Sequence, residues 1–108
     1  MGNMIGSVIS KNGKEIKLSE ERWYHIVEPH DYMAGNQDII FETLESPDII
    51  VEGRKKEFIA LKYYAKISIS EKHAVVIYKE LDNEGFVITA LMTSKPEGMM
   101  QKGVVWKK

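Results

Sequence analysis

Three histidines, His25, His30 and His73, are the residues of this chain that can exchange a proton near neutral pH. Each could therefore act as a general acid or base. His30 follows Pro29 and precedes Asp31, whose carboxylate could orient the imidazole ring. His25 lies within a helical pattern, where a polar surface position is an equally good interpretation. His73 opens a strand pattern after a charged turn, where simple exposure to solvent is the better interpretation.

Two lysines interrupt strand patterns that are otherwise apolar. Lys62 and Lys79 could each reach solvent from a half-open sheet face, which is the commoner situation, or could stabilise an anion. Thr89 lies in a further strand pattern, where its strand propensity alone explains its presence. Beside a histidine, the two lysines and Thr89 could together bind a phosphodiester.

Other residues could contact a larger ligand, whereas the histidine spacing does not favour a metal site. Arg22 lies off the apolar stripe of its helix, and Tyr64 and Trp106 could stack on bases, although buried aromatic core is the commoner role. His25 and His30 do not have the four-residue spacing that places two metal ligands on one helix face, and the chain has no cysteine. We expect no metal site and no cofactor.

Two helices are expected to position these residues. The segment from Ser19 to His30 begins with a candidate N-cap and two glutamates, and Trp23, Ile26 and Val27 form its apolar stripe. A second helix is expected from about Gln37 to Glu45, with Asn36 as its cap. Trp23 and Ile26 should be buried against a sheet.

Strand patterns occupy the rest of the chain. Before the helices, Asn12-Gly13 predicts a hairpin between Met4–Ser10 and Lys14–Leu18. After them, the period changes to two and predicts strands at Asp48–Glu52, Glu57–Tyr64, His73–Glu80, Phe86–Thr93 and Gly103–Lys107. We therefore expect an α+β fold in which two N-terminal helices pack on a curved, mainly antiparallel sheet of about four to five strands, preceded by a short hairpin.

Composition sets limits on organisation and partners. The chain has 108 residues, a hydrophobic content of 44% and a net charge of −1, which indicates a single folded domain over residues 1–108. A balanced charge does not favour a general nucleic-acid or membrane binder, although a local basic cleft is compatible with it. We expect neither a secretory signal nor a membrane span, and the absence of cysteine is compatible with the cytoplasm.

Several short motifs occur in an order that resembles a known family. They are Trp23-Tyr24-His25-Ile26, Pro29-His30, Glu42-Thr43-Leu44 with Ser46-Pro47-Asp48, the strand lysines, Ile88-Thr89-Ala90 and Trp106. From about Leu18 to Trp106 the chain is similar to a phage and prokaryotic branch of the barnase–EndoU–colicin–RelE ribonuclease superfamily. That branch usually shows His-Pro-Glu after the helix, where this chain has Glu28-Pro29-His30-Asp31.

The resemblance implies a metal-independent, toxin-type endoribonuclease with its active site on the concave face of a curved sheet. His25 or His30 would deprotonate a ribose 2′-hydroxyl, which attacks the adjacent phosphate. Lys62 and Lys79 would stabilise the phosphorane, and Thr89 would donate to a non-bridging oxygen. The products would be a 2′,3′-cyclic phosphate and a 5′-hydroxyl. Arg22, Tyr64 and Trp106 would contact the RNA.

Two other hypotheses remain open at this point. The chain could be a non-catalytic module of the same fold whose open face receives an RNA or a protein partner, an antitoxin among them. It could also be an inactive structural relative kept as a small dimer. In every case we expect a phage-related protein of the cytoplasm that is a monomer or a small homo-oligomer and has no membrane partner.

Overall fold

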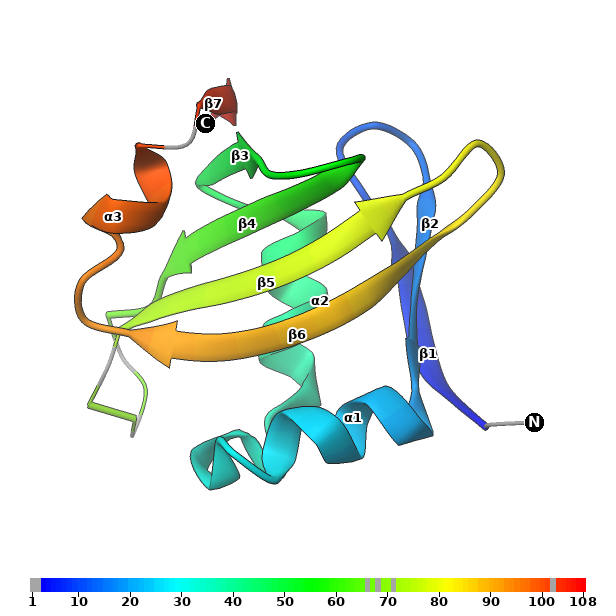
Figure 1. The fold of residues 1–108 in the computed structure, drawn as a ribbon. Helices are drawn as coiled ribbons and strands as arrows, with labels where there is room; N and C mark the ends of the chain where they lie inside the picture. Colours follow the sequence, from blue (N-terminus) through cyan, green and yellow to red (C-terminus); the bar gives the residue numbers. More distant parts are fainter. Residues whose placement is uncertain (1–2, 66, 68, 71, 102) are drawn as a thin grey trace.

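The computed structural model describes residues 3–65, 67, 69–70, 72–101 and 103–108. Within these residues, seven strands form one sheet in the order β1-β2-β6-β5-β4-β3-β7 (Figure 1). The elements in chain order are β1 Met4–Ile9, β2 Glu15–Ser19, α1 Glu20–Val27, the 3-10 helix η1 Asp31–Met33, α2 Gln37–Glu45, β3 Ile49–Glu52, β4 Glu57–Tyr63, β5 His73–Glu80, β6 Gly85–Thr93, α3 Glu97–Met100 and β7 Val104–Lys107.

The expected architecture of two helices on four to five strands, with a separate hairpin, is wrong. The described residues form a mixed α+β fold with a seven-stranded sheet and three α-helices, of which α3 has only four residues. The hairpin is part of the sheet, because Ile16 and Lys17 of β2 pair in parallel with Gly85 and Phe86 of β6. Such a pairing joins segments about seventy residues apart, so local periodicity carries no signal for it.

The first helix forms for the reasons that the sequence indicated. The Ser19 hydroxyl accepts a hydrogen bond from the Arg22 amide at 3.1 Å, which satisfies one of the unpaired donors of the first turn. The predicted burial of Trp23 and Ile26 is confirmed. At the second helix, Asn36 occupies the N-cap position, but its side-chain amide donates to the Tyr32 carbonyl at 2.9 Å instead of capping α2.

The sheet curves around α2, which contacts β1, β4 and β5 although these strands lie far apart in the sheet order. Figure 1 shows α2 behind β5, with β1 and β2 turned toward it. The curvature brings the Lys11 ammonium of the β1–β2 turn to 5.3 Å from the ring centroid of Trp106 on β7, the opposite edge strand. The helices therefore fill the concave face, where the resemblance had placed an active site.

The two faces of the sheet bury separate apolar clusters. The helix face contributes Ile16, Leu18, Ala60, Ala74, Val76, Tyr78, Val87, Ala90 and Met92, which pack with residues of both long helices. The opposite face, here called the outer face, buries Val51, Ile59, Leu61 and Val75, with Met99 of α3 against them. Since side chains alternate along a strand, Lys79, Ile77 and Val75 of β5 all lie on the outer face.

The hairpin is also held by a buried carboxylate at the end of β5. The Ser10 hydroxyl and the Asn12 side-chain amide both donate to Glu80, the latter at 2.8 Å. Ser10 and Glu80 are buried, so this pairing satisfies polar groups that would be costly to leave alone. Burial, and to a smaller extent the negative charge of Glu80, raises the pKa of the nearby Tyr78 hydroxyl.

We predict that Gly85→Ala lowers the free energy of unfolding by about 1–3 kcal/mol, as overpacking of a filled site does. A Cβ at Gly85 would lie 2.5 Å from both the Lys79 carbonyl oxygen and the Ile16 Cδ1 atom, at the β2–β6 junction. Urea unfolding measures the change. Gly98→Ala is the control, because a Cβ there meets nothing within 4 Å. Equal stability of the Gly85 variant and the parent would contradict the tight junction.

Candidate functional site

The residues predicted to form one catalytic cleft lie on different sides of the sheet. Lys62 pairs with Ala74, whose side chain belongs to the helix-face cluster. Lys79 pairs with Glu57 and Phe86 on the outer face. The ammonium groups of Lys62 and Lys79 therefore extend from opposite faces and do not meet at one phosphate.

Lys62 and Tyr64 serve the end of α2. The Lys62 ammonium donates to the Ser46 carbonyl at 2.8 Å and lies 5.9 Å from the Tyr64 ring centroid. A cation at the C-terminal carbonyls of a helix is favoured by the helix dipole. The Tyr64 hydroxyl donates to Glu42 at 2.8 Å, and its pKa is raised, first by burial and then by this hydrogen bond. Both side chains thus have local structural roles.

His25 on α1 and His30 just before η1 also lie on the helix side of the sheet. His25 is exposed in the last turn of α1. The His30 Nδ1 atom is 3.3 Å from the Tyr32 hydroxyl. That hydroxyl accepts from the Met92 amide at 3.1 Å and lies 3.4 Å from the Met92 carbonyl oxygen. Tyr32 thereby satisfies the backbone of β6 beyond the short segment that pairs with β2, and the same hydroxyl contacts His30.

His73 is the histidine that lies on the outer face, and it is only partly exposed. Its ring centroid is 5.0 Å from that of Tyr63, and its Nδ1 atom is buried without a hydrogen-bond partner among the described residues. With Pro96 and Met100 it lines a largely apolar hollow of about 130 Å³. His73 is six residues from Lys79 along β5, or roughly 20 Å at the usual rise of a strand.

The outer face carries a row of three side chains on adjacent strands that sequence reasoning did not bring together. Lys17 of β2 pairs with Phe86 of β6, and Phe86 pairs with Lys79 of β5. We call these three residues the Phe86 row. Phe86 has an exposed fraction of 39% although it is a large apolar residue. The Cβ atoms of paired residues lie about 5 Å apart, so an accessible ring stands between two lysine side chains.

Thr89 is brought to the same face by an irregularity in β6. Ile77 pairs with Thr89 and Tyr78 with Val87, so Ile88 is an extra residue that the register skips. In a regular strand Phe86 and Thr89, three apart, would point to opposite faces. The bulge places both on the outer face, with Thr89 about 7–8 Å from Lys79 as a diagonal neighbour.

Arg22 lies beside the Lys17 end of the Phe86 row. A hollow of about 230 Å³ between β2, β6 and the start of α1 is lined by Arg22, Lys17, Phe86, Met4, Ser19, Glu21, Glu84, Gly85 and Val87. Three of the eight predicted site residues, Arg22, Lys79 and Thr89, therefore gather around Phe86. Trp106 does not, because it lies on β7 against Lys11.

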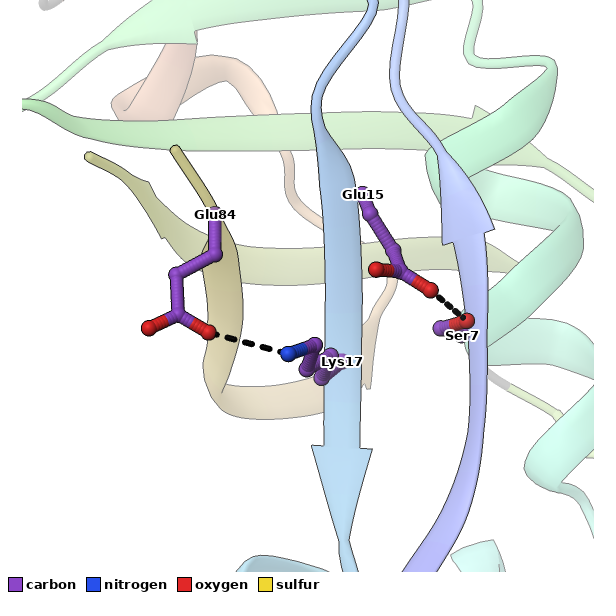
Figure 2. A network of polar contacts seen from close by, with 4 residues as sticks. All are labelled: Ser7, Glu15, Lys17 and Glu84. Atoms are coloured by element: carbon purple, nitrogen blue, oxygen red, sulfur yellow. Dashed lines mark hydrogen bonds and ion pairs between the residues drawn. The ribbon is translucent and has the colours of Figure 1, made fainter. Parts of the chain in front are cut away.

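Acidic neighbours neutralise part of this positive charge. Figure 2 shows Glu15 and Lys17, two residues apart on β2, reaching in different directions. Glu15 accepts from the Ser7 hydroxyl at 2.8 Å, and Lys17 forms an ion pair with Glu84 at 3.0 Å. The hydrogen bond and the charge of Glu84 raise the pKa of Lys17, so this lysine stays protonated. Lys79 has no ion-pair partner among the described residues.

Two signals in the sequence could have identified the missed residues. Lys17 alternates with Ile16 and Leu18, which predicts a polar outward position, but its neighbour in the sheet follows only from the parallel pairing. Phe86 directly follows Gly85, and a glycine at a strand end is a sign of close backbone approach.

Comparison of the chain with protein-family models, with curated proteins and with solved structures gives no match. The described residues contain no group of three histidine, aspartate or glutamate side chains placed to hold a metal ion. In the same part of the chain, every helix is too short or too polar to cross a bilayer.

We predict that Tyr32→Phe lowers the free energy of unfolding by about 1–2 kcal/mol, because the Met92 amide loses its partner. Thermal and urea unfolding measure this loss. Tyr24→Phe is the matched control, since Tyr24 is exposed on α1 and its hydroxyl should contribute less than about 0.5 kcal/mol. Two variants of equal stability would show that Tyr32 does not hold the edge of β6.

Proposed function

We propose that this chain is a non-catalytic module that binds single-stranded RNA on the outer face of its sheet. The observation that carries the proposal is the Phe86 row, an accessible aromatic ring between Lys17 and Lys79 on adjacent strands. A ring exposed on a sheet can stack on an unpaired base, and the flanking ammonium groups can contact the phosphates on either side. The span between the two lysines is roughly 10 Å, or two strand spacings.

The surrounding residues support the same ligand. The Thr89 hydroxyl, two positions along the sheet, can donate to a phosphate oxygen or accept from a ribose hydroxyl. Arg22 lines the adjoining hollow, where its side chain is available to a second base or phosphate. Unpaired bases offer a π-face whatever their sequence, so a single aromatic platform favours binding with little sequence preference.

Binding is favoured over cleavage because no histidine lies near the row. A general base must come within hydrogen-bond reach of the 2′-hydroxyl that it deprotonates. His25 and His30 lie in the helix layer, and His73 is roughly 20 Å from Lys79 along β5. Within the proposal, the chain is a non-cleaving relative of the ribonuclease superfamily that it resembles, and it acts in the cytoplasm.

We predict that Phe86→Ala weakens binding of a single-stranded RNA decamer by about 5- to 150-fold, the effect of losing one stacked base. Lys79→Ala should lower the slope of log affinity against log salt by about 0.7, the loss of one phosphate contact. Fluorescence anisotropy of a labelled decamer over a range of salt concentrations measures both changes.

Tyr63→Ala is the matched aromatic control, since Tyr63 is also exposed but lies at the far end of the sheet beside His73. It should leave the affinity unchanged. An equal loss for Tyr63→Ala and Phe86→Ala, or no binding by the parent, would contradict the proposed platform. Gel analysis of the same mixtures tests cleavage, and a 2′,3′-cyclic phosphate product that is lost in His30→Ala would restore the ribonuclease hypothesis.

A further inference from the structure

The Phe86 row by itself is a weak place for a polyanion. Each of its cations has a carboxylate nearby. Glu84 forms an ion pair with Lys17, and Glu21 lines the same hollow as Arg22. Glu57 is the neighbour of Lys79 in the strand register. Net attraction for a phosphate backbone therefore requires further positive charge close to the row. The chain supplies such charge at one position, where three basic residues follow one another.

That position is the turn between β3 and β4, residues Arg54, Lys55 and Lys56, here called the basic turn. The Glu57 amide donates to the Arg54 carbonyl at 2.8 Å, and Lys55 and Lys56 have φ angles of +41° and +69°. Two consecutive positive φ angles define a type I′ hairpin turn, whose preferred residues are asparagine and glycine. Lysine tolerates this conformation poorly, so the basic side chains are present at a cost to stability.

The basic turn directly continues the Phe86 row. Glu57 of β4 pairs with Lys79, and the Glu80 amide donates to the Lys56 carbonyl at 3.1 Å. Figure 1 shows this turn beside the strands of the row, above β5. All three basic residues are exposed. The Lys56 ammonium forms an ion pair with the highly exposed Asp82, with 3.6 Å between its Nζ atom and the Asp82 Oδ1 atom. Arg54 and Lys55 have no ion pair within the described part of the chain.

We infer that the basic turn is a second anchor for the RNA, contacting the backbone of the nucleotides that extend beyond the Phe86 row. This inference rests on the proposed function and adds the direction in which the RNA runs. The RNA would cross β2, β6 and β5 and end at the start of β4. From Phe86 to the start of β4 the distance is roughly 10 Å. A short oligomer stacked on Phe86 does not need the turn, whereas a longer one reaches it.

The test replaces the two strained lysines by the residues that the turn prefers, in the variant Lys55→Asn/Lys56→Gly. The melting temperature should rise, because a type I′ turn favours this pair. Affinity for a single-stranded RNA decamer should fall by about 10- to 30-fold at 0.1 M salt, and the salt slope by about 1.4, as for two lost phosphate contacts. Affinity for a trinucleotide should stay at the parental value.

Lys95→Asn/Lys107→Asn is the charge-matched control, since both lysines are exposed and lie away from the turn. It should keep the parental affinity and salt slope for the decamer. Parental decamer binding by the turn variant, or equal losses for trinucleotide and decamer, would overturn the second anchor while leaving the Phe86 platform intact. If the parent binds neither oligomer, the proposed function fails, and the second anchor fails with it.

Discussion

The parallel pairing of β2 with β6 is the contact on which the rest of the structure depends. It exists because Gly85 lacks a side chain, which lets the Ile16 side chain and the Lys79 carbonyl approach its backbone closely. On the helix face the pairing places Ile16 and Leu18 in the main core. On the outer face it places Lys17 beside Phe86. One backbone contact thus sets both the packing of the hairpin and the composition of the candidate RNA surface.

The curvature that follows from this pairing decides which face is available to a ligand. A sheet that wraps around α2 buries its concave side, and polar residues there take part in structure: Lys62 holds the end of α2 and Tyr32 holds the edge of β6. The outer face is covered in part by α3 and is open where β5 ends and β6 begins. Accessible cations and an accessible ring occur together in that open part, which is why the proposed function lies there.

Sequence periodicity predicted the local structure well and the tertiary arrangement poorly. The caps and apolar stripe of α1 depend on neighbours within one turn, so Ser19, Trp23 and Ile26 were placed correctly. The number of strands and the place of the hairpin depend on a contact between distant segments, which no local pattern records. For the same reason Lys62 and Lys79 looked equivalent, since both strands have mixed faces and only the register between β4 and β5 separates them. The structure gathers Arg22, Lys79 and Thr89 around Phe86, a residue that sequence reasoning missed because an aromatic residue in a strand is usually core.

The extra residue at Ile88 gives β6 two halves with opposite parity. From Thr89 onward, odd-numbered positions face outward, whereas at Val87 and Phe86 the even-numbered position does. The alternation that fills the core and the alternation that exposes the ligand surface are therefore set separately along a single strand. If Ile88 entered a regular ladder with no residue removed, Phe86 and Thr89 would be three positions apart, and either the ring or the hydroxyl would turn into the core. The bulge at Ile88, rather than the identity of any one side chain in β6, keeps an aromatic platform and a hydrogen-bond donor on the same side of the molecule.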